Sequence, residues 1–109
     1  MQYIKVNFTR EGWHRWPEAK GLRSYLSFPH RHMFHVSVAV MNVQSRRIEF
    51  HDLMDYARSC FPGGDMGAQS CEEMAQRLAR RLCATYGRDV TVEVSEDGEA
   101  GAGYTAVAN

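Results

Sequence analysis

The 109 residues of this chain predict an α+β fold, in which an antiparallel sheet is covered on one face by two helices. Two observations lead to this prediction. Segments in which apolar and polar residues alternate lie towards both ends of the chain, and two segments with apolar residues at helical spacing lie between them. The length suits one domain, residues 1–109. A sheet of this kind leaves unpaired edges that an oligomer would cover.

The first strand is predicted at residues 3–8, where apolar side chains alternate with polar ones. The alternation disappears over residues 10–29, a stretch that contains Trp13 and Trp16. Long loops in small domains are usually functional or disordered, and the aromatic content argues against disorder. We therefore expect an ordered loop at a ligand site, where the indoles either stack on a flat heterocycle or pack in a core or interface.

The second strand is predicted from about His32 to Val43, followed by a polar turn and by residues 48–50, which close the hairpin. If this strand begins near His30, the side chains of His30 and His32 lie on the same face of the strand. The apolar residues that share this face are Phe34, Val36, Val38 and Val40. Neutral imidazole is a common zinc ligand, so a metal site at the start of this strand is expected.

Two helices are predicted next. The first has apolar residues at helical spacing and stops at residues 62–64, Pro-Gly-Gly; these residues are Phe50, Leu53, Met54, Ala57 and Phe61. The second begins at Ser70, which forms a capping box with Glu73, and ends at Gly87. Its apolar stripe contains Met74, Leu78, Leu82 and Tyr86.

Residues 90–94 alternate valine with polar residues and predict a half-buried strand. Residues 96–99 form a turn, and residues 102–108 return as the last strand. The predicted order is therefore ββααββ.

Composition excludes several classes of partner. The chain has 13 basic and 13 acidic residues, so its net charge gives no reason to expect nucleic acid or a membrane surface. It has three cysteines without a CxxC motif and starts with a strand pattern rather than a leader peptide. Free thiols and a cytoplasmic location are expected.

Five motifs in order resemble the 6-pyruvoyl-tetrahydropterin synthase and 6-carboxy-tetrahydropterin synthase family, which has the T-fold. His-Arg-Trp-Pro at residues 14–17 resembles the family's Ala-Ala-His-Arg-Leu-Pro segment, and His-Arg-His-Met-Phe at 30–34 resembles its His-Gly-His-Asn-Tyr zinc motif. Residues 48–53 resemble Val-Asp-Phe-x-x-Leu, and residues 70–75 resemble Pro-Thr-x-Glu-x-x-Ala. Residues 92–96 resemble the strand that ends in the family's pterin-anchoring glutamate.

The resemblance implies a zinc site beside a pterin pocket. The three ligands to Zn²⁺ would be His14, His30 and His32. Glu96 would anchor a pterin or purine-like ring, and Ser70 and Glu72 would frame the same pocket, which lies between subunits. The family forms barrel-like toroids, typically hexamers, so a homo-oligomer is implied.

The chain also departs from the family. Residues 24–29 lack the cysteine that precedes the family's zinc motif, and residues 59–67 lack the histidine of its Asp-His pair. Three residues are candidate replacements: His51 as a proton carrier, Asp65 as a base and Cys71 as a thiolate at a helix N-terminus. Each has a structural alternative: His51 as a first-turn helix residue, Asp65 as a turn residue and Cys71 as a space-filling residue. His35 is expected to be packed or hydrogen-bonded rather than a ligand.

Three functions follow as hypotheses. The first is a zinc-dependent carbon–oxygen lyase of the synthase type, acting on a dihydroneopterin triphosphate-like pterin on a route to queuosine or other 7-deazaguanine precursors. The second is a divergent T-fold protein that binds a pterin, purine or nucleotide without synthase chemistry. The third is a zinc-dependent lyase or hydrolase of another small substrate.

Overall fold

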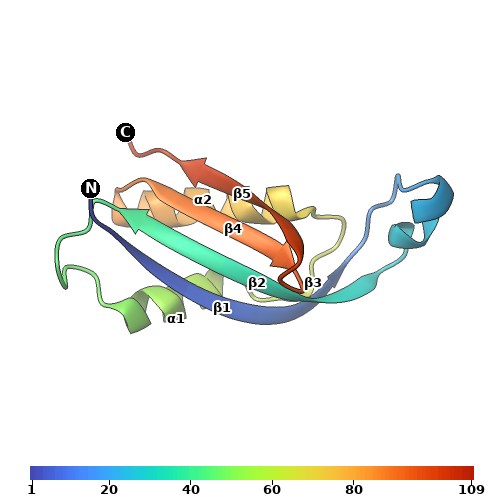
Figure 1. Cartoon of the computed structure of the whole chain (residues 1–109), viewed down its shortest axis with the longest axis horizontal. Helices are drawn as coiled ribbons and strands as arrows, with labels where there is room; N and C mark the ends of the chain where they lie inside the picture. Colours follow the sequence, from blue (N-terminus) through green and yellow to red (C-terminus); the bar gives the residue numbers. More distant parts are fainter.

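Five strands form one open sheet, in the order β3-β1-β2-β4-β5, in the computed structural model of residues 1–109 (Figure 1). The strands are β1 (Tyr3–His14), β2 (His30–Met41), β3 (Gly64–Asp65), β4 (Val90–Glu96) and β5 (Ala100–Ala106). The helices are the 3-10 helix η1 (Gly21–Ser27), α1 (Phe50–Cys60) and α2 (Cys71–Tyr86). The α+β class is therefore confirmed. None of the helices has the length and apolarity needed to cross a bilayer.

The prediction of a purely antiparallel sheet is wrong at one edge. Strands β1, β2, β4 and β5 pair in antiparallel fashion, but β3 pairs in parallel with Gly12 and Trp13 of β1. The sheet is therefore mixed. The sequence does not predict β3, because its two residues, the last glycine of the Pro-Gly-Gly stop and Asp65, carry no alternation.

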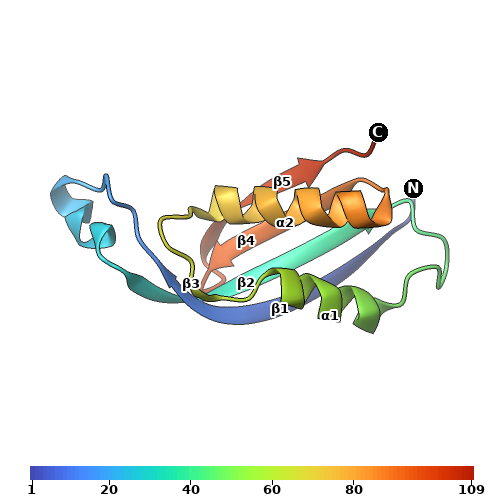
Figure 2. The same cartoon turned by 180° about the vertical axis from the view of Figure 1, so that it is seen from behind.

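The alternation of side chains explains which face of the sheet is buried. Even-numbered residues of β1, β2 and β4 point towards the helices, and odd-numbered residues point away. Figure 2 shows α1 and α2 side by side across this one face, as predicted. Leu53, Leu82 and Phe34 are fully buried between the layers. The core is therefore a single layer of apolar side chains between helices and sheet.

The ends of α2 follow the sequence signals. The Ser70 hydroxyl accepts a hydrogen bond from the Glu73 N–H, and the Glu73 carboxylate accepts one from the Ser70 N–H. Gly87 ends the helix in the left-handed conformation, with φ of 65°. The predicted capping box and C-terminal stop are both confirmed.

Other boundaries differ from the predictions. Strand β1 extends to His14, well into the predicted loop, because its pairing with β2 overrides the weak alternation beyond Phe8. Strand β2 begins and ends two residues earlier than predicted, and β5 also begins two residues earlier. Residues 48–49 precede α1 and are not a strand.

The remaining part of the predicted loop, residues 15–29, forms an arm that extends beyond the sheet (Figure 1). Its base is closed by a hydrogen bond from the Trp16 N–H to the Leu26 carbonyl, and η1 contains no buried residue. The longest dimension of the chain is 49 Å against 25 and 20 Å for the other two. The two termini lie at the end of the sheet opposite to the arm (Figure 1).

Candidate metal centre

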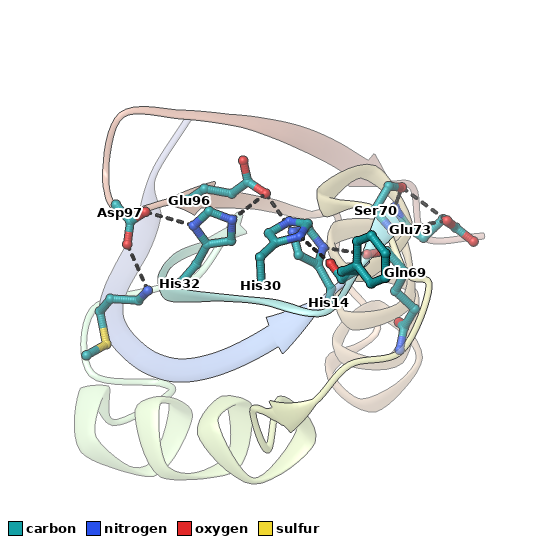
Figure 3. Close-up of polar contacts among 10 residues, drawn as sticks. His14, His30, His32, Gln69, Ser70, Glu73, Glu96 and Asp97 are labelled. Atoms are coloured by element: carbon teal, nitrogen blue, oxygen red, sulfur yellow. Dashed lines mark hydrogen bonds and ion pairs between the residues drawn. The ribbon is translucent and has the colours of Figure 1, made fainter. Parts of the chain in front are cut away.

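Three histidines and one glutamate converge where β1 ends, β2 begins and β4 ends. His14, His30, His32 and Glu96 each offer one ligand atom, and these atoms all lie within 4.8 Å of one another (Figure 3). His14 and His30 are direct cross-strand partners, and Glu96 pairs with Phe34. All four occupy even-numbered positions and so continue the core-facing stripe of their strands.

The buried ring of Phe34 packs against the histidines of this cluster. Its side chain is fully buried, and its ring lies edge to face with His14 and His32, with centroids 5.3 and 5.8 Å away. His14 is 7% exposed and is the one buried histidine. The cluster therefore rests on the apolar core, where electrostatic interactions are stronger than in water.

Each histidine is held at Nδ1 by a hydrogen-bond acceptor. Nδ1 of His14 lies 2.8 Å from the Gln69 carbonyl oxygen, and Nδ1 of His30 lies 3.0 Å from the Phe28 carbonyl oxygen. A carbonyl oxygen only accepts, so these two nitrogens carry the hydrogen. Nδ1 of His32 lies 2.8 Å from a carboxylate oxygen of Asp97 and donates in the same way.

The three Nε2 atoms are consequently directed at the centre of the cluster. Oε2 of Glu96 lies 2.7 Å from Nε2 of His14 and 3.3 Å from Nε2 of His32. The 2.7 Å separation is that of a hydrogen bond, with a proton between the two atoms, and tetrahedral coordination to one zinc ion would hold them further apart. Nε2 of His32 is buried and makes no hydrogen bond, an arrangement that a metal ligand explains. The donor set therefore fits a metal ion.

Asp97 orients His32 from the turn that follows β4. Asp97 has φ of 57° and, besides binding His32, accepts a hydrogen bond from the Met33 N–H through its other oxygen. The hydrogen bonds from His32 and from the Met33 N–H hold the pKa of the Asp97 carboxyl below its usual range. The carboxylate is therefore ionised and suited to accept from imidazole.

A cavity of about 730 Å³ adjoins the cluster, within the usual size range of small-molecule sites. His14, His30 and Glu96 form its inner wall, and Trp16, Pro17 and Leu26 of the arm form another. The N-terminus of α2 closes it with Ser70, Cys71 and Glu72. The structure thus brings the predicted ring-anchoring and pocket-framing residues to one cavity beside the predicted metal ligands.

Cys71 lies in this cavity but is not activated. Burial, together with the nearby carboxylates of Glu96 and Glu72, raises the pKa of its thiol to about 12. The expected stabilisation of a thiolate by the helix N-terminus is outweighed, because burial removes water from the charged form. The thiol is therefore protonated at neutral pH. Cys60, Cys71 and Cys83 are all free thiols.

The other two proposed replacements lie elsewhere. His51 is exposed at the start of α1 and contacts the Glu49 carboxylate, and it lines a separate cavity with residues 1–4. Asp65 is exposed in β3 and accepts a hydrogen bond from the Gly67 N–H, which is its turn role. His35 is on the opposite face of β2 and outside the candidate cluster, as expected. It is exposed, and its imidazole packs over Gly98, where an added Cβ would lie 3.6 Å from the ring.

Two roles were missed from the sequence. Glu96 contributes one of the four candidate ligand atoms, and Asp97 positions His32, another candidate ligand. The available signal was the strand period, which places Glu96 on the same face as Val94 and therefore on the histidine side. The acidic turn at residues 96–99 concealed it.

A scan of protein-family models and a search of curated proteins found no match to this chain.

Proposed function

We propose that this chain is a zinc-binding T-fold protein of the pterin synthase type, which takes a pterin or purine-like ring in the cavity beside the metal. One observation carries the proposal. Three imidazoles, each held at Nδ1, direct Nε2 to a common point at the wall of a ligand-sized cavity. A purely structural cluster would not require this convergence.

The choice of zinc follows from the donor set. Three imidazole nitrogens with one carboxylate or open position suit tetrahedral Zn²⁺, whereas Mg²⁺ and Ca²⁺ prefer oxygen ligands. Carbonyl and carboxylate partners at the second ring nitrogen are typical of zinc-bound histidine. His14, His30 and His32 would hold the ion, and Glu96 is close enough to be a fourth ligand.

When bound, zinc would act as a Lewis acid towards substrate oxygens or lower the pKa of a bound water. The protein supplies position and hydrogen bonding. Both histidine contacts of Glu96 use Oε2, which leaves Oε1 to accept hydrogen bonds from a ring N–H or amino group. The exposed indole of Trp16 offers a face for stacking.

A binding protein without synthase chemistry is the second candidate, and a specific observation favours it. Cys71 is protonated, and neither His51 nor Asp65 lines the cavity. The cavity therefore lacks the separate nucleophile and proton carrier that the family uses. The same placement removes the support for a hydrolase that depends on His51 or Asp65.

Assembly into a barrel-like homo-oligomer, such as a hexamer, is part of the proposal. The outer edge of β5 is unpaired, and most of β1 lacks a partner on its outer side because β3 covers only two residues. Open edges of this kind pair with further strands. Sedimentation or light scattering of the purified chain measures the oligomer directly.

The experiment that tests the proposed function uses zinc-loaded protein incubated with dihydroneopterin triphosphate or dihydroneopterin, followed by mass spectrometry of the products. Loss of a side-chain fragment or of phosphate identifies the lyase. An unchanged pterin that remains bound identifies the binding protein. If neither compound binds or reacts, the pterin assignment is wrong.

A further inference from the structure

The cavity beside the metal centre has a strong imbalance of charge. Its lining includes four carboxylates, Glu18, Glu72, Glu73 and Glu96, but Arg15 is the single arginine or lysine in it. The other basic residues of the arm, Lys20 and Arg23, do not line the cavity. Even with a divalent metal bound, negative charges outnumber positive charges by one. Such a wall repels polyanions.

The N-terminus of α2 would ordinarily be the place where a phosphate binds, because its free N–H groups attract anions. Here the capping box takes up the N–H groups of Ser70 and Glu73. Oε1 of Glu73 accepts from both the backbone N–H and the hydroxyl of Ser70, at 3.1 and 3.2 Å. The Glu73 N–H in turn donates to the Ser70 hydroxyl. Glu72, in the same first turn, adds a second negative charge.

The remaining walls suit a flat and largely uncharged molecule. Trp16 is 53% exposed, and Pro17 and Leu26 continue the apolar surface of the arm. Ala100 and Gly101, which also line the cavity, add no long side chain to it. Carboxylates placed around such a slot bind N–H and amino groups rather than acidic ones.

We infer that this cavity takes a flat nitrogen heterocycle with a neutral side chain and that it discriminates against phosphorylated forms of the same ring. The inference rests on the proposed function, and it names the substrate class within it. The ligand would be a dihydropterin or related base without phosphate, so that any elimination would concern a carbon side chain rather than a phosphate group.

The test compares two compounds that differ only in phosphate. Zinc-loaded protein is titrated calorimetrically with 7,8-dihydroneopterin and with its triphosphate, at low and high salt. The metal content is measured before and after each titration, so that removal of zinc by the triphosphate is recognised. At low salt the Kd of the triphosphate is expected to be at least about tenfold higher, and the difference should shrink at high salt.

Charge variants show whether the carboxylates cause the difference. Glu72→Lys and Glu18→Lys should each lower the ratio of the triphosphate Kd to the dihydroneopterin Kd about tenfold. Asp55→Lys, which changes an exposed acidic residue of α1 outside the cavity, should leave both Kd values unchanged.

Three results would overturn the inference. The first is that the triphosphate binds as tightly as dihydroneopterin or more tightly. This result would leave the proposed pterin site standing. The second is a Kd ratio unaffected by both lysine variants. The third is that zinc stays bound while neither compound binds, and this result also overturns the proposed function.

Discussion

Asp97 holds His32 in place from across the β4–β5 turn: its Oδ2 accepts the hydrogen of Nδ1 at 2.8 Å, and its Oδ1 accepts the Met33 N–H at 2.9 Å. These two hydrogen bonds join the turn to the first residues of β2. They fix both the tautomer and the direction of the His32 ring, so that Nε2 is the atom left for a metal. The turn is thus part of the candidate metal centre, although it provides no candidate ligand beyond Glu96.

Removal of this carboxylate should weaken metal binding without abolishing it. Asp97→Ala frees the His32 ring to rotate, and loss of an outer partner of this kind typically costs about 10–100-fold in metal affinity. Competition with a fluorescent chelator measures the zinc Kd. Glu99→Ala, on the same exposed turn, is the matched control and should have the wild-type Kd. Equal zinc affinity in Asp97→Ala and wild type would show that His32 needs no such support.

The pairing of β4 with β5 should be sensitive to alanine substitution at one glycine of β5 and tolerate it at another. A Cβ at Gly101 would lie 2.1 Å from the Val94 carbonyl oxygen, so the two strands would have to move apart. A Cβ at Gly103 would lie 3.3 Å from the flexible Glu93 side chain. Gly101→Ala should therefore lower the free energy of unfolding by about 1–3 kcal/mol or more, and Gly103→Ala by clearly less. Urea denaturation measures both, and equal losses would contradict the register of these strands.

The Cys71 thiol should be unreactive in the folded protein. Because burial raises its pKa to about 12, few molecules carry a thiolate at pH 8, and iodoacetamide should label Cys71 far more slowly than it does in urea. The raised pKa contributes stability that is complete below the ordinary thiol pKa and is lost as pH rises towards 12. Peptide mapping by mass spectrometry measures the rate. Rapid labelling of native Cys71 at pH 8 would restore it as a candidate nucleophile.

The capping box of α2 should contribute measurably to stability, because it satisfies two N–H groups at the start of the helix. Ser70→Ala removes the acceptor for the Glu73 N–H and should cost about 1 kcal/mol in the free energy of unfolding. Ser59→Ala, whose hydroxyl donates to the Tyr56 carbonyl near the C-terminus of α1, serves as the control and should cost less. A Ser70→Ala protein as stable as wild type would mean that the cap is replaced by water.

Local sequence signals predicted the fold where they were strong. The period of two in β2 and β4 and the capping box of α2 each determine structure over a few residues, and all three agree with the structure. The extension of β1 to His14 and the parallel bridge to Gly64 were not predictable in this way. Both depend on pairing with strands that are distant in sequence.

The candidate site shows the same division. The three histidines were identified by their order and spacing, and the strand register explains why His14 faces His30. The roles of Glu96 and Asp97 depend on which way the β4–β5 turn folds over β2, and this is set by tertiary contacts. The inactive state of Cys71 depends on burial, which a helix-start pattern does not reveal.

The most direct test of the central claim is the zinc content of the purified chain, measured by mass spectrometry of the metal. About one zinc ion per chain is expected for the wild type, and less than about a tenth of that for His14→Ala, His30→Ala and His32→Ala, because each variant removes one of three nitrogen ligands. His35→Ala, an exposed histidine on the opposite face of β2, is the control and should keep the full content. Full zinc retention in the three ligand variants, or a wild-type protein that binds no zinc when the metal is supplied, would contradict the metal centre.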